Sequence, residues 1–161
     1  MAYDIFLKLD GIPGESTDDK HRDEIVLESF SWGESNPGAH ATASGAGAGK
    51  VSMQDFHFTA RVSKASPTLM LYCASGKHIP TGQMSESRAG EDRSGADFLV
   101  YKFTNIVVSS ISQAGDANDR PLDSVSIAFA KVNIEYKPQK ADGSLAAAVH
   151  FGWDLKTNRN A

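Results

Sequence analysis

The sequence has a single cysteine, Cys73, and no long run of apolar residues. One cysteine can form neither an internal disulfide nor a cysteine-rich metal site, so nothing implies an oxidising compartment. No segment approaches the roughly 20 apolar residues that a membrane-spanning helix needs. The N-terminus alternates polar and apolar residues instead of placing a basic segment before a long apolar one. We therefore expect no signal peptide and no membrane insertion.

Positive charge is also scarce. The 161 residues include 16 Lys and Arg against 20 Asp and Glu, which gives a formal net charge of −4. This balance produces no field that would attract nucleic acid, so we expect no nucleic-acid partner. A chain of this length can bury one proper core, and we expect one domain over residues 1–161.

Short strands dominate the pattern. Apolar residues alternate with polar ones at Tyr3, Ile5, Leu7 and Leu9, and again over residues 56–62, which predicts two strands. Further strands are predicted at 25–32, 81–88, 98–103, 106–111, 124–136 and 149–155, with a polar loop at 112–121. Many strands without strand–helix alternation are typical of a barrel or a sandwich.

Two of these strands carry apolar side chains on both faces, namely residues 25–32 and 124–136. In the second strand the apolar phase changes near Ala130 and Lys131. Val125, Ile127 and Phe129 precede the change, and Val132, Ile134 and Tyr136 follow it. The change predicts either a β-bulge or a strand whose two ends bury opposite faces, as at barrel corners or where a neighbouring subunit is touched.

One short helix is predicted. Ser66 is a suitable N-cap, Pro67 fits the first helical position, and Gly76 ends the apolar run that follows.

Residues 33–49 are rich in Gly, Ala, Ser and Asn and cannot form a core, so they predict a long loop that orders against a partner. The run from Gly45 to Lys50 resembles a phosphate-binding loop. However, Ser44 stands where its first glycine belongs, and Val51 replaces the magnesium-binding Ser or Thr. We therefore expect no nucleotide cofactor.

No motif indicates catalysis. The five histidines lack the spacing of metal sites, Cys73 lies among apolar neighbours in the predicted helix, and no Gly-x-Ser-x-Gly turn is present. We expect no catalytic residue, no metal and no cofactor, and hence no enzyme. A triad assembled only in three dimensions would escape this reasoning.

Several segments together resemble one known family. They are 10–16 (DGIPGES), 30–33 (FSWG), the glycine-rich loop before Val51, 56–59 (FHFT), Ser66-Pro67, 75–78 (SGKH), 107–110 (VVSS) and 151–154 (FGWD). In this order and spacing they are similar to the Hcp family, the tube protein of the bacterial type VI secretion system.

The resemblance implies a mainly β fold: a small barrel of two packed sheets, one short flanking helix, an extended loop at 33–49 and a polar tail at 156–161. It also implies hexameric rings that stack into a tube. A sheath drives that tube, with a VgrG-type spike at its tip, out of the bacterial cytoplasm, and effectors travel in the channel.

The same resemblance suggests roles for particular residues. Ser31 matches a channel-lining position and is a candidate cargo contact, although an ordinary strand residue fits equally well. Trp32 and Trp153 are candidate interface anchors, with core packing as the alternative. The candidates for ring stacking are Pro37, Gly38, Ala39, His40, Gly45, Gly47, Gly49 and Lys50.

Two other functions compete with the tube subunit. One is a toxin, although family members with catalytic activity carry an added domain and the tail here is short. The other is a monomeric barrel that binds a small ligand in an apolar pocket.

Overall fold

The computed structural model describes residues 3–37, 50–88 and 97–161, and most of them lie in antiparallel strands. A single helix, α1 (Ala65–Ser75), interrupts the strands. The strands are β1 (Tyr3–Leu9), β2 (Ile25–Leu27), β3 (Ser29–Ser31), β4 (Glu34–Ser35), β5 (Ser52–Met53), β6 (Phe56–Arg61), β7 (Ile79–Arg88), β8 (Leu99–Ala114), β9 (Leu122–Tyr136), β10 (Val149–Asp154) and β11 (Arg159–Asn160). The prediction of a mainly β fold with one short helix is confirmed.

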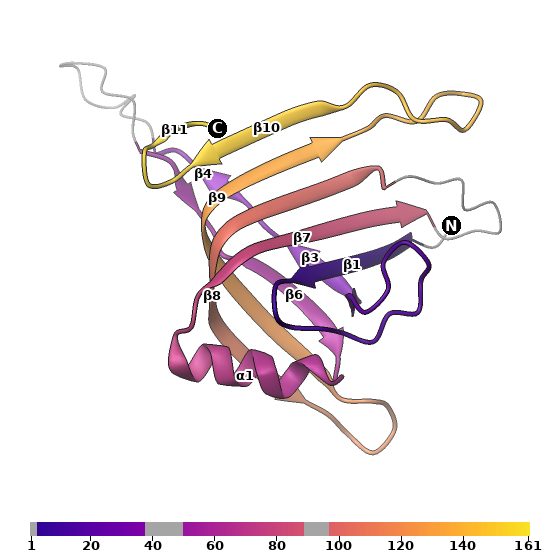
Figure 1. The fold of residues 1–161 in the computed structure, drawn as a ribbon, viewed down its shortest axis with the longest axis vertical. Coiled ribbons are helices and arrows are strands. Elements are labelled where there is room, and N and C mark those ends of the chain that lie inside the picture. The colour runs from indigo at the N-terminus through magenta and orange to yellow at the C-terminus, as the bar shows by residue number, and fades with distance from the viewer. Residues whose placement is uncertain (1–2, 38–49, 89–96) are drawn as a thin grey trace.

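Nine of these strands form one curved sheet, and β4 and β5 form a separate two-stranded ribbon. The order β11-β10-β9-β8-β7-β1-β2 makes one layer, while β6 adds to β9 and β3 adds to β6. Figure 1 shows β1 and β7–β10 side by side, with β3 and β6 crossing behind them and α1 at one end. Among the described residues the hydrogen-bonded ladder does not close, but the segment that contains β2 and β3 joins its two ends.

This joining segment explains the first two-faced pattern. The predicted strand 25–32 is in fact two strands, because β2 pairs with β1 and β3 pairs with β6. Glu28 lies at the break, and its N–H donates to the carbonyl of Thr59 at 2.8 Å. Ile25 and Leu27 are buried on one side of the break and Phe30 is half-buried on the other. The segment therefore contributes β2 to the layer that contains β1, and then β3 to the layer that contains β6.

The second two-faced pattern comes from a change of phase in β9. Phe129 and Val132 are both buried, so the inward side changes between them, as the sequence predicts. The paired strand β8 changes at the same point, because Phe103 and Ile106 are both buried and Asn105 between them has a left-handed φ of 55°. The first half of β9 then pairs with β6 and the second half with β10. The barrel-corner alternative is correct for β9.

The register of this hairpin shifts elsewhere, between Val108 and Ser110 of β8. Two expectations are wrong here. Residues 98–103 and 106–111 form one strand rather than two, and residues 112–114 belong to that strand rather than to the loop. The continuous pairing with β9 holds this region extended despite its polar composition.

An aromatic cluster fills the space between the layers. The ring of Phe103 lies 4.9 Å from that of Phe56 and 5.0 Å from that of Phe129, measured between centroids. Phe58, Met84 and Val125 are also buried in this core. Each buried side chain of this size contributes about 1.5–3 kcal/mol of stability.

The helix α1 begins two residues earlier than predicted, with Lys64 at the N-cap in place of Ser66 and no side-chain cap. Ser66 lies in its first turn because its hydroxyl has a different partner: it donates to the carboxylate of Asp123, which is buried on β9. The predicted end is correct, since Gly76 has a left-handed φ of 68° and its N–H donates to the carbonyl of Tyr72.

Asp123 therefore fastens the helix to the hairpin, because Gln113 also donates to its carboxylate, at 2.9 Å. We predict that Asp123→Ala lowers the free energy of unfolding by about 3 kcal/mol, since it leaves the buried hydroxyl of Ser66 without its acceptor and removes the bond from Gln113. Asp123→Asn keeps an acceptor oxygen and should cost less. Urea denaturation measures both, with exposed Asp19→Ala as the control. Equal losses for Asp123→Ala and Asp19→Ala would contradict the role of the buried carboxylate.

Candidate assembly and channel surfaces

Hydroxyl side chains cover the outward side of β3, β6, the first half of β9 and the end of β8. The strand register aligns them in two rows. One row runs Ser31, His57, Ser126, Ser110, and the other runs Ser29, Thr59, Ser124, Ser112. We call these eight residues the hydroxyl face.

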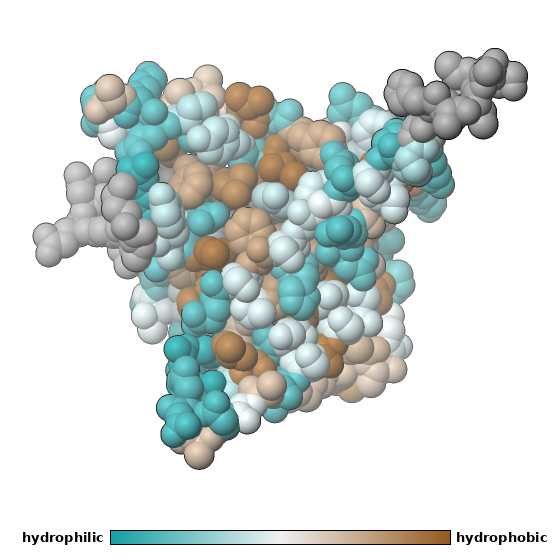
Figure 2. All heavy atoms as spheres, turned by 180° about the vertical axis from the view of Figure 1, so that it is seen from behind, coloured by the Kyte–Doolittle hydropathy of each residue, from teal (hydrophilic) through white to brown (hydrophobic). Residues whose placement is uncertain are grey.

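The hydroxyl face is chemically uniform, since neither of its rows contains Asp, Glu, Lys or Arg. Its polar groups bond to one another: the hydroxyls of Ser29 and Thr59 are 2.6 Å apart, and Nδ1 of His57 lies 3.1 Å from the hydroxyl of Ser126. Figure 2, which shows the molecule from behind, has pale spheres of near-neutral hydropathy over much of its centre. Such a surface offers few groups that could bind another molecule strongly.

Ser31 lies in this face, exposed on β3. Sequence reasoning singled out Ser31 alone and missed the other members. A signal for them was present, because Ser, Thr and His alternate with buried apolar residues over 56–60 and 124–127. Alternation shows which side a residue takes, but it does not show which strands lie next to each other.

Both side edges of the hydroxyl face are open within the part of the chain that the structure describes. β3 pairs only with β6, and residues 107–114 of β8 pair only with β9. An edge strand presents unpaired N–H and C=O groups that can pair with another chain.

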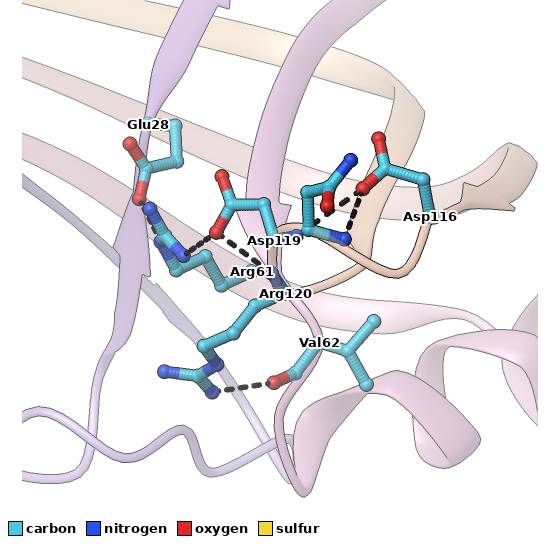
Figure 3. Close-up of polar contacts among 7 residues, drawn as sticks. Glu28, Arg61, Val62, Asp116, Asp119 and Arg120 are labelled. Carbon is cyan, nitrogen blue, oxygen red and sulfur yellow. Dashed lines mark hydrogen bonds and ion pairs between the residues drawn. The ribbon is translucent and has the colours of Figure 1, made fainter.

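An ion-pair cluster closes one end of this face (Figure 3). Arg61 donates from Nε to Glu28 at 3.0 Å and from Nη1 to Asp119 at 3.1 Å. Hydrogen bonding to Asp119 and then to Glu28 raises the pKa of Arg61. The pKa of Asp119 is lowered by the N–H of Arg120 and by Arg61. These exposed pairs hold the turn between β8 and β9 against β6, and Arg120 adds a bond to the carbonyl of Val62 at 3.2 Å.

Apolar side chains emerge from the other layer. Val149, Tyr136 and Phe151 are 64%, 47% and 36% exposed. They lie on the same side of β9 and β10 as the buried residues of these strands. They therefore extend the core-facing side of the sheet beyond the region where the other layer covers it. Together with neighbours in the same cross-strand rows they form the apolar overhang: Leu99, Tyr101, Ile134, Tyr136, Val149 and Phe151.

A carboxylate lies at the inner end of the overhang. Glu86 pairs in register with Leu99, and burial raises its pKa. Burial, together with the charge of Glu86, also raises the pKa of Tyr101. The overhang is therefore a partly dehydrated environment in the single chain.

The two tryptophans lie where the core meets the overhang. Trp32 packs against the core and meets the ring of Tyr101 edge-on at 6.1 Å. Trp153 and Phe151 line a surface hollow with Val51 and residues 34–36. The indole N–H groups of both tryptophans are buried, and no described residue accepts a hydrogen bond from either. Both tryptophans are half-buried, so each has one buried part, as core packing requires, and one exposed part, as an interface anchor requires.

Only part of the predicted stacking loop can be placed. Pro37 and Lys50 are exposed and flank the β4–β5 ribbon, in which Glu34 pairs with Met53 and Ser35 with Ser52. The other predicted residues lie outside the described part of the chain: Gly38, Ala39, His40, Gly45, Gly47 and Gly49.

The remaining reactive residues have structural surroundings. His21 is buried, stacked on Phe6 at 4.4 Å, and each ring nitrogen lies 2.9 Å from a carboxylate, one of Glu24 and one of Asp97. Cys73 is partly buried and packs against the core. Across residues 3–37, 50–88 and 97–161, no three His, Cys, Asp or Glu side chains gather to hold a metal ion. Within the same ranges, no helix has the length and apolar character to cross a membrane.

Comparison with known proteins identifies the family of this chain. Residues 6–136 match the family described as "Type VI secretion system effector, Hcp". The chain is 39% identical to Protein hcp1 of Pseudomonas aeruginosa over the full length of both. It superposes on a solved type six secretion system protein with a TM-score of 0.91 at 33% identity, covering 99% of this chain and all of the other.

A second solved structure, Hcp1 of Salmonella typhimurium, gives a TM-score of 0.83 at 36% identity with both chains fully covered. The match spans most of the chain, and both two-faced strands fall within it. This protein belongs to the Hcp family of the type VI secretion system.

Proposed function

We propose that this chain, as one domain over residues 1–161, is a non-catalytic tube subunit. Copies close into a hexameric ring, rings stack into a tube, and the channel carries effectors. The observation that supports the proposal is the combination of an uncharged hydroxyl face with two open strand edges and an apolar overhang beside it.

The hydroxyl face suits the wall of a channel. A sheet with two open edges can continue into the same sheet of the next copy, and a closed ring of such sheets has no edges left. Small hydroxyl side chains would then line the inside. They can hydrogen-bond to many kinds of cargo, and they do not hold any of them by strong ion pairs.

The apolar overhang suits the contact between copies. Exposed apolar side chains next to unsatisfied indole N–H groups gain from burial against a partner that supplies acceptors. Heterologous contacts that close by rotation produce a ring, because the overhang of one copy meets a different surface of the next.

The finer features of the proposal follow from the resemblance to the Hcp family. These features are a ring of six subunits and, as partners, the sheath and a VgrG-type spike. A further one is export from the bacterial cytoplasm without a signal peptide. Proposed residue roles are Ser31 at the channel wall, Trp32 and Trp153 near the interface, and residues 37–50 in stacking.

The monomeric ligand-binding alternative finds no support. Phe56, Phe103 and Phe129 fill the space between the layers with ring contacts of about 5 Å. The surface hollows lie outside this core.

The first prediction from this proposal concerns the ring. In sedimentation velocity the protein should run at the mass of six copies, and Val149→Glu should shift it toward the monomer, because a charge would be buried in the overhang contact. Leu71→Glu is the matched control, since Leu71 is 62% exposed on α1. A monomeric wild type at all concentrations would refute the ring. Dissociation by Leu71→Glu alone would move the contact to the helix.

The second prediction concerns cargo. Ser31→Arg should reduce the cargo that co-purifies with rings by roughly tenfold, which corresponds to 1.4 kcal/mol of lost binding, because it places a long cation in an uncharged face. Ser75→Arg on α1 provides the same change outside the face. Quantitative mass spectrometry of purified rings measures both variants. Unchanged cargo with Ser31→Arg in intact rings would exclude Ser31 from the channel contact.

The third prediction concerns stacking. Deleting residues 41–49 should leave single rings intact and shorten tubes in electron micrographs, because these residues have too little apolar surface to hold the subunit together. Loss of the rings themselves would show that the segment acts within a ring and not between rings.

A further inference from the structure

We infer that the outward side of β1 and β7–β9 binds an acidic segment of a partner protein. One cross-strand row there runs Lys8, Gln83, Lys102, Asn133, as the pairing of four neighbouring strands shows. We call these four residues the donor row. Each can donate hydrogen bonds, and none is a carboxylate.

The cations of the donor row have no direct ion-pair partner in the described part of the chain, and the carboxylates of Asp97 and Glu135 line the same hollow as Lys102. Lys8 and Lys102 are exposed, and no hydrogen bond or ion pair joins either to a described residue. The rows on each side differ, since Lys131 interacts with Asp154 and Lys137 lies 3.5 Å from Glu135. The donor row therefore keeps two positive charges on a chain whose net charge is −4.

The surface is hollowed along the part of this row from Gln83 to Asn133, and Lys8 lies next to Gln83 outside these hollows. Two hollows lie over it and share Val100, Lys102 and Glu135 in their linings. Gln83 lines the first and Asn133 the second. Lys102 is thus at the centre of a continuous trough and not on a protruding surface.

The chain itself supplies an acceptor at one end of the row. Asn133 donates from Nδ2 to the main-chain oxygen of Ala161 at 3.3 Å. The row ends at Gly152, the partner of Asn133 on β10. A Cβ at Gly152 would lie 2.0 Å from the same oxygen, so only glycine admits this approach. An oxygen acceptor thus already occupies the Asn133 end, and the two cations have none.

The spacing suggests the ligand. Neighbouring strands lie about 4.8 Å apart, so the backbones of Lys8 and Lys102, two strands apart, are separated by roughly 10 Å. Two Asp or Glu side chains at i and i+3 of an extended, polyproline II-like segment lie on one face about 9.3 Å apart. Carboxylates can also accept from the side-chain amides between and beside the lysines. An acidic segment can therefore engage the row from Lys8 through Gln83 to Lys102.

The donor row and the hydroxyl face belong to different layers, which Figure 1 shows one behind the other. If the hydroxyl face lines a channel, as proposed above, the acidic partner approaches from outside the ring. The binding itself does not require a ring, because every member of the row comes from one chain.

The test is fluorescence anisotropy with a labelled hexaglutamate peptide at low ionic strength, with the full chain in its native assembly state. We expect saturable binding that weakens as salt is added, and an increase in Kd of at least tenfold for the double variant Lys8→Gln/Lys102→Gln. Lys140→Gln, an exposed lysine outside the trough, should leave the Kd within twofold.

Two further measurements make the outcome decisive. Sedimentation of each variant reports the assembly state, so loss of rings and loss of peptide binding are read separately. A labelled dodecathymidylate tests whether the row takes any polyanion. The inference fails if hexaglutamate does not bind, if Lys140→Gln weakens binding as much as the double variant, or if the oligonucleotide binds as tightly as the peptide.

Discussion

The structure depends on one backbone constraint, the paired change of phase in the β8–β9 hairpin. Asn105 takes a left-handed conformation, and both strands turn a new side toward the core at that point. The hairpin can then belong to two layers, with β6 beside the first half of β9 and β10 beside the second. A left-handed residue other than glycine carries a conformational cost, and Asn is among the residues that tolerate it best.

This constraint decides where each surface lies. Before the change, the outward side of β9 carries Ser124 and Ser126, which belong to the hydroxyl face. After it, the inward phase runs through Val132 and Ile134 to Tyr136, where the core gives way to the apolar overhang. One strand therefore supplies both the proposed channel wall and part of the proposed contact between copies. In the proposed tube, assembly and cargo passage would be coupled through the same hairpin.

The sequence predicted those features that depend on neighbours along the chain. Alternation located most of the longer strands and the change of phase near Ala130, and the glycine that follows an apolar run located the end of α1. It placed the start of α1 wrongly because Ser66 bonds to Asp123, which is 57 residues away. It missed the hydroxyl face and the donor row for the same reason. Both are rows across strands that are distant in sequence, and their register is set by pairing that a single sequence does not reveal.

The central claim is that the open edges of the hydroxyl face are paired with further copies of the chain. Hydrogen–deuterium exchange at high and low protein concentration tests this claim directly. The account predicts that the amides of residues 29–31 and 107–114 that point away from β6 and β9 are protected in the assembled protein and exchange rapidly on dilution. The amides of the buried strand β6 stay protected at both concentrations. Equal exchange of the edge amides at both concentrations, with assembly verified, would contradict it.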